Sequence, residues 1–358
     1  KPDEQKPEEQ NPEQQKPDEQ KPDEQKPEEQ IPDEQKPDEQ KPEEQNPEQQ
    51  KPDEQKPDEQ NPDKQNPDKQ NSDKQNPDEQ KPAKASRKAA AAETHTGDHG
   101  EYTLPKGATW QGVDSLPDKS GYYYLTDFVT ISSTWRPVDG TVLCLNGYGI
   151  SLNGNGPVIE VQPGVTFTLC DCNGNGGGIT HVYRSNGKGA GVLVGQSATT
   201  KDTARTNTAV FNMYGGAIYN NYPWEAGGEN AASASGVLIG GGTFNMYGGK
   251  ITGNGLTDVE SLGGGVFVAN QGSFLMSGGE ISGNHATEGG GVFVGGSYGY
   301  HDFSASAGGT FTMNGGKITG NSGTGGGVYV SNKGTFTVSG NVNITGNKAG
   351  DKTSNNVY

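Results

Sequence analysis

Short runs in which apolar and polar residues alternate fill the chain after about residue 100, and the same runs recur. One unit, residues 242–268, contains GTFNM, then GGKITGN, then GGGVFV. Alternation of this kind is typical of a half-buried β-strand, and glycine pairs allow the backbone angles of a tight corner. Each unit is therefore predicted to form three short strands joined by corners.

The recurrence of single residues indicates that these units stack. The phenylalanine of the unit recurs 25 to 37 residues apart, at Phe211, Phe244, Phe274, Phe311 and Phe336. A stack of coils explains this recurrence, because identical positions of successive coils lie about 4.8 Å apart. Helices are disfavoured, since each glycine costs a helix about 1 kcal/mol relative to alanine. We predict an all-β fold, namely a right-handed single-stranded parallel β-helix.

Stacking turns positions of the repeat into columns of side chains. The methionines are expected to form a second interior column beside the phenylalanines: Met213, Met246, Met276 and Met313. The side-chain amides of a corner column are expected to hydrogen-bond to one another: Asn254, Asn284, Asn321 and Asn347. Charges of alternating sign are expected on the outside, at Lys250, Glu280 and Lys317. We predict that these columns maintain the fold.

The β-helix is expected to span residues 101–358, with its first coils at about 101–200 and its regular repeats at about 208–347. The chain begins with Lys1, and its last residues resemble the start of another strand. We therefore expect the sequence to be a piece of a longer protein that is truncated at its C-terminus.

Residues 1–80 consist of sixteen pentads that end in glutamine, fifteen of which carry proline at the second position. They lack glycine and aromatic residues, and their 12 lysines and 27 acidic residues give a net charge of −15 out of −17 for the chain. Proline at this spacing excludes a helix, and nothing offsets the ordering entropy. We predict a disordered acidic spacer with a reach of roughly 250 Å, at about 3.1 Å per residue.

Residues 81–100 are expected to form a flexible junction. His95, Asp98 and His99 form an H-x-x-D-H motif there that could supply metal ligands. A structural zinc site needs three or four ligands on a rigid frame, whereas the neighbouring threonine and glycine favour a mobile linker. We therefore predict no metal and no cofactor.

Cys144 and Cys170 are 26 residues apart, close to one coil, so we consider a disulfide between them. The alternative is three reduced thiols, because Cys172 makes the number of cysteines odd. The C-x-C pair and one distant cysteine lack a fourth partner for zinc.

A resemblance to a known family is carried by the stretch from Gly121 to Gly147, which contains YYYLTDFVTI, WRPVDG and VLCLNG. This stretch resembles a module of large surface proteins from Gram-positive gut bacteria. The GTFxMxGGxIxGN and GGGVxV units resemble the adhesin-like β-helix repeats that follow that module. The resemblance covers roughly residues 101–358 and implies a secreted, wall-attached protein of the bacterial cell surface, with a proline-rich stalk that spans the cell wall.

The favoured function is a binding protein that presents the β-helix to a host or bacterial surface glycan or protein. Aromatic, glycine-rich inserts that break the repeat are the expected binding surface, because rings stack on sugar faces and loops on a rigid scaffold carry function. The candidate residues are Tyr219, Tyr222, Trp224, Tyr298, Tyr300 and His301. An alternative is a purely structural rod that supports a distal domain.

A polysaccharide-cleaving enzyme on the same scaffold is a third alternative. Glycosidases need paired carboxylates that face one bond, and the acidic residues of the repeat region are scattered, so we predict no catalytic residues. Neither part of the chain has the basic face that nucleic-acid binding requires. No run of about 18 apolar residues is present, so we predict no membrane span.

Overall fold

The computed structural model describes residues 95–174, 177–182, 188–195, 208–223, 234–257, 260–269, 271–296, 308–349 and 353–358. The chain divides into two units, Lys1–Pro82 and Ala83–Tyr358, and every described residue belongs to the second. These described ranges contain strands, turns and bends but no helix. In particular, none of the described residues belongs to a helix long and apolar enough to cross a membrane.

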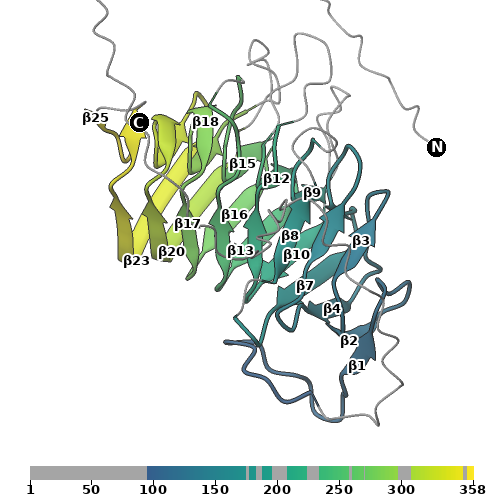
Figure 1. Cartoon of the computed structure of the whole chain (residues 1–358). Coiled ribbons are helices and arrows are strands. Elements are labelled where there is room, and N and C mark those ends of the chain that lie inside the picture. The colour runs from purple at the N-terminus through teal and green to yellow at the C-terminus, as the bar shows by residue number, and fades with distance from the viewer. Residues whose placement is uncertain are drawn as a thin grey trace, which may run out of the picture. The chain divides into compact units, whose positions relative to one another are not determined.

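Strands of successive coils lie side by side and form three faces (Figure 1). The first face contains β1 (Gln111–Val113), β2 (Gly121–Leu125), β4 (Thr141–Cys144), β7 (Thr166–Cys170), β10 (Val210–Met213), β13 (Thr243–Met246), β16 (Ser273–Met276) and the start of β20 (Thr310–Thr319). The second face contains β3 (Val129–Ile131), β5 (Ile150–Leu152), β8 (Gly178–His181), β11 (Ala217–Tyr219), β14 (Lys250–Thr252), β17 (Glu280–Ser282) and the end of β20. The third face contains β6 (Ile159–Val161), β9 (Val192–Gly195), β12 (Val237–Gly240), β15 (Val266–Ala269), β19 (Val292–Val294) and β22 (Val328–Val330).

The first two faces join at the last coils. Because β20 pairs with β16 through its start and with β17 through its end, both faces belong to one 15-stranded sheet. β23 (Thr335–Thr345) then pairs in parallel along β20. A smaller sheet at the same end contains β18 (His285–Glu288), β21 (Ser322–Thr324), β24 (Lys348–Ala349) and β25 (Thr353–Ser354), of which the last two pair antiparallel.

The register confirms the all-β, stacked parallel arrangement that the repeat predicts. Each regular coil gives one strand to each face, and that strand pairs in parallel with the equivalent strand of the next coil. In the first face, the pairing of β10, β13, β16 and β20 aligns phenylalanine with phenylalanine and methionine with methionine. Alternate residues of a strand point to opposite sides, so aligned strands give one inward and one outward set of columns.

Stacked phenylalanine rings fill the interior along the first face. Neighbouring rings have centroids 4.6–5.7 Å apart and planes within 16° of parallel. The column comprises Phe167, Phe211, Phe244, Phe274, Phe311 and Phe336. Phe167 extends the expected column by one coil. The four methionines are fully buried, and so are the phenylalanines except the last, Phe336, which is partly buried; both interior columns thus lie where the repeat places them.

A column of asparagines fixes one corner of the coils. Asn254, Asn284 and Asn321 each donate the side-chain amide to the side-chain oxygen of the next asparagine, at 2.9 Å. The same oxygen also accepts the backbone N–H of the preceding asparagine, at 2.9–3.0 Å. Asn221 adds a rung before the column, and Asn356 accepts from Asn347 at its end. These buried amides are therefore satisfied by one another, which is what burial of polar groups requires.

Glycine is needed at the corner between the first and second faces. Gly249, Gly279 and Gly316 occupy the same position of successive coils with φ of 82°, 82° and 87°. A Cβ on Gly279 would lie 2.6 Å from Met246 Cε and 2.9 Å from the carbonyl oxygen of Gly249. Both the backbone angle and the close approach of the previous coil therefore require glycine here.

Replacement of Asn284 by alanine tests the asparagine column. The variant leaves the backbone N–H and one of the two side-chain amide hydrogens of Asn254 without their acceptor, and the carbonyl of Ile251 without its donor. At about 1–3 kcal/mol for each orphaned group, we expect Asn284→Ala to lower the free energy of unfolding by about 3 kcal/mol or more. Urea denaturation followed by circular dichroism measures this change.

Asn245→Ala is the matched control, because Asn245 is a half-buried outward residue that donates to Asn212 at 2.9 Å. We expect this variant to lose about 1 kcal/mol. Equal losses in the two variants would contradict a special role for the corner column.

Candidate metal centre

The cysteines lie on the outward side of the first face, in the first coils of the stack. In β4, Leu143 belongs to the hydrophobic core, so the next residue, Cys144, points outward. Cys144 pairs in register with Tyr124 of β2 and with Cys170 of β7. Cys172 follows β7 by two residues, and its Sγ lies 3.5 Å from that of Cys144. Cys144 and Cys172 therefore meet at one corner of two neighbouring coils.

Residues 95–110, which we call the strap, pack on this outward side. The ring of His95 stacks on Tyr124 of β2, with centroids 4.2 Å apart and 1° between the planes. Farther along the strap, the ring of Tyr102 packs edge-on against that of Tyr214, the residue directly after β10, with centroids 5.4 Å apart. The strap therefore covers the cysteine end of the first face.

Trp110 orients the second histidine of the strap. The ring of His99 stacks on Trp110 with centroids 4.7 Å apart and 22° between the planes. Trp110 also meets Tyr122 of β2 edge-on at 6.3 Å and His95 edge-on at 5.4 Å. Aromatic contacts from both the strap and the sheet thus hold the two imidazole rings.

Gly97 allows the strap to approach the second thiol closely. A Cβ on Gly97 would lie 2.2 Å from Cβ and 2.5 Å from Sγ of Cys172, so any larger residue would displace the strap. Gly97 stands midway between His95 and His99 in the sequence. The close approach of the backbone at Gly97 to Cys172 therefore places both imidazole rings beside the thiols.

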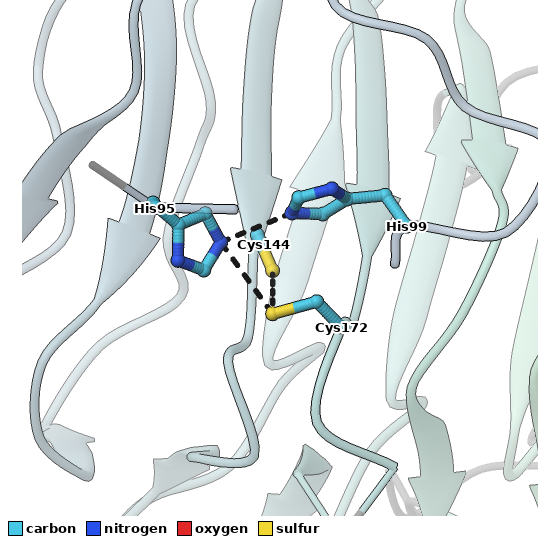
Figure 2. A group of neighbouring side chains, drawn as sticks. All are labelled: His95, His99, Cys144 and Cys172. Carbon is cyan, nitrogen blue, oxygen red and sulfur yellow. Dashed lines mark hydrogen bonds between the residues drawn. The ribbon is translucent and has the colours of Figure 1, made fainter. Parts of the chain in front are cut away.

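The four side chains converge on one point, as Figure 2 shows. Nε2 of His95 lies 3.0 Å from Nε2 of His99 and 3.5 Å from Sγ of Cys172. The ligand atoms of His95, His99, Cys144 and Cys172 all lie within 4.8 Å of one another. Two thiols and two imidazoles are a ligand set of structural zinc sites, in which four protein ligands leave no position open for a substrate.

The thiols of the cluster do not ionise alike. Hydrogen bonds from Cys170, and from the imidazoles of His95 and His99, lower the pKa of Cys144 against the opposing effect of burial. Burial and the negative charge of Cys144 raise the pKa of Cys172 to about 12. The hydrogen bond to Cys144, together with burial, also raises the pKa of Cys170. The cluster thus favours a thiolate at Cys144, the form in which cysteine binds metals.

Two expectations about this region are wrong. Residues 95–100, which we expected in a flexible junction, pack against the sheet through the rings of His95 and His99. The cysteines, which we expected to lack further zinc partners, receive both of these histidines. Asp98 of the same motif is exposed and instead accepts the N–H of Gly100 at 3.0 Å.

The disulfide considered between Cys144 and Cys170 is also absent, since all three cysteines are free. The two residues are stacked neighbours, as their spacing predicts. Neighbouring strands, however, lie about 4.8 Å apart and point both Cβ atoms the same way, whereas a disulfide needs its Cβ atoms about 3.8 Å apart. The thiol of Cys144 instead faces that of Cys172.

The candidate binding residues of the inserts are described only in part. Tyr219 is the last residue of β11 and pairs with Thr252, so it belongs to a coil and not to an insert. Tyr222 forms a bridge with Gly189. Both tyrosines are half-buried. The other candidates lie outside the described residues: Trp224, Tyr298, Tyr300 and His301.

Comparisons with protein-family models, with curated proteins and with solved structures found no match to this chain.

Mild oxidation tests the arrangement of the thiols. We expect diamide, which takes two electrons and two protons from a pair of thiols, to link Cys144 to Cys172, because their Sγ atoms lie 3.5 Å apart. Mass spectrometry reads the pairing after digestion with a protease that cuts before Asp171 and with chymotrypsin, which cuts after Tyr148 and Phe167, so that the three cysteines lie on separate peptides.

Cys172→Ser is the control, and we expect this variant to form no disulfide within the chain. A link between Cys144 and Cys170 in either protein would contradict the arrangement.

Proposed function

We propose that this protein is an adhesin-like cell-surface protein whose parallel β-helix binds a host or bacterial surface glycan, with its proline-rich N-terminal segment acting as a wall-spanning stalk. It would then belong with the adhesin-like β-helix repeat proteins of Gram-positive gut bacteria. The repeat motif supports this placement, and so does the stacking of its coils in register. We further propose a right-handed coil, because crossovers between parallel strands of one sheet are almost always right-handed.

An outward column of aromatic and amide side chains carries the proposal. Tyr214 and Tyr247 follow β10 and β13 at the same position, and their rings stack with centroids 4.5 Å apart. Beside them, Asn245 donates its amide to Asn212 at 2.9 Å. Rings that stack on sugar faces and amides that bond to hydroxyl groups form a surface suited to a glycan.

The neighbours of this column leave room for a ligand next to Tyr247. Ser277 occupies the position of Tyr247 in the next coil. Its backbone N–H donates to the carbonyl of Met246, just as the backbone N–H of Tyr247 donates to the carbonyl of Met213. Ser277 is small and exposed. The last ring of the column therefore adjoins a short hydroxyl side chain and not another ring.

A glycan array probed with the full chain tests the proposal. We expect binding to a subset of host or bacterial surface glycans, and we expect Tyr247→Ala to weaken it about 2- to 13-fold, since an aromatic contact is worth about 0.5–1.5 kcal/mol. Thr312→Ala is the matched control, because Thr312 is a half-buried residue of the same face in β20. Affinities for the best array ligand, measured by calorimetry, give the comparison.

Two results would contradict the proposed function. Absence of binding to every glycan on the array would favour the alternative of a structural rod. Binding that survives Tyr247→Ala would exclude the outward aromatic column as the site. Deletion of residues 297–306 would then test the insert that the sequence favours.

A further inference from the structure

We propose that His95, His99, Cys144 and Cys172 bind one zinc ion, which fastens the strap to the first coils of the β-helix. The site would be structural, because four protein ligands complete a tetrahedral zinc centre and leave no position for a substrate. This inference is independent of the proposed glycan binding, since none of its four residues belongs to the outward column of Tyr247.

The separations between the ligand atoms match a zinc tetrahedron. With Zn–N of about 2.0–2.1 Å and Zn–S of about 2.3 Å, the ligand atoms of a tetrahedral centre lie about 3.3–3.8 Å from one another. Three of the six pairs here are His95 with His99 at 3.0 Å, His95 with Cys172 at 3.5 Å, and Cys144 with Cys172 at 3.5 Å. The remaining pairs lie within 4.8 Å, so shifts of up to about 1 Å would bring all four ligand atoms onto the tetrahedron.

The donor atoms select the metal. Calcium and magnesium prefer oxygen ligands, whereas two thiolates and two imidazoles in a tetrahedral arrangement suit zinc. The histidines offer Nε2, and the two thiols lose their protons when the metal binds. The chemistry and the geometry thus indicate the same ion.

The frame around the cluster holds the ligands before the metal arrives. Cys144 is fixed in a central strand of the first face, between β2 and β7. The rings of His95 and His99 are held by Tyr124 and Trp110. Preorganised ligands bind a metal at a smaller cost in conformational entropy.

The absence of a side chain at Gly97 is a second, independent feature of the site. The backbone at Gly97 approaches Cys172 so closely that a Cβ would overlap the cysteine side chain. A strap held only by its aromatic rings has no need for this contact with a thiol. A zinc ion explains this contact. Because Gly97 has no side chain, the backbone between the two histidines can lie against Cys172, which brings all three of these ligands to one ion.

The position of the site in the sequence suggests its role. His95 lies fifteen residues after the last proline-containing pentad, and Cys172 lies in the first coils of the β-helix. An ion held by both segments would join the chain that follows the spacer to the folded sheet. A pull on the N-terminal segment would then load the zinc ligands together with the packing of the strap.

Titration of the full chain with cobalt(II), under a reducing agent that does not bind metals, tests the proposal directly. We expect one equivalent of cobalt to produce thiolate charge-transfer bands and the intense visible bands of a tetrahedral centre. One equivalent of zinc should then bleach them. No such bands, or bands that need several equivalents, would overturn the proposal.

Variants assign the ligands. We expect Cys172→Ser and His99→Asn each to weaken zinc binding by more than the roughly 10–100-fold that loss of an outer-shell partner costs. Asp98→Asn is the matched control, because Asp98 belongs to the same motif as the two histidines but is exposed and lies outside the cluster, and we expect it to bind zinc as the unmodified chain does. Unchanged affinity in His99→Asn would overturn the assignment, and circular dichroism shows whether each variant is folded.

Limited proteolysis tests the fastening of the strap. Lys106 is an exposed residue of the strap, between Tyr102 and Trp110. We expect zinc to slow tryptic cleavage after Lys106 at least about 10-fold in the unmodified chain and not in Cys172→Ser, since a bound ligand suppresses local opening. Equal cleavage with and without zinc would show that the ion does not hold the strap.

Discussion

In-register stacking of parallel coils is the constraint on which the rest of the structure depends. A strand pair alone tolerates a shift in register, but a shift of one residue moves every interior side chain to the outside. The corner asparagines oppose such shifts, because each oxygen accepts both a backbone N–H and a side-chain amide from the coil before it. A shifted coil would bury these amides without partners, which is costly. The phenylalanine column and the glycine corners then follow from the same alignment.

The same alignment also creates the outward columns, and these differ along the first face. Near β4 the outward residues are Cys144 and Cys170, which the strap covers, and after β10 and β13 they are Tyr214 and Tyr247. Tyr102 of the strap reaches the ring of Tyr214, so the two regions adjoin. The first face of the stacked coils therefore carries both the proposed zinc site and the proposed glycan surface.

The sequence predicts the repeating part well because each column is visible as a recurring residue. The stacking of Phe244 on Phe274 and the hydrogen bond from Asn254 to Asn284 both follow from counting along the chain. The candidate metal centre does not repeat. Its histidines precede Cys144 by some 45 residues, and only the packing of the strap brings them together. The H-x-x-D-H motif contains both histidines, but the C-x-C motif supplies only Cys172, so the two motifs together do not predict the four ligands.

A crystal structure of the full chain grown with zinc, with data collected on both sides of the zinc absorption edge, tests the central claim most directly. We expect one anomalous peak among Nε2 of His95, Nε2 of His99 and the two Sγ atoms of Cys144 and Cys172, above coils stacked in register. A structure without that peak, or with the strap away from the first face, would contradict the claim that stacking builds an outward metal site.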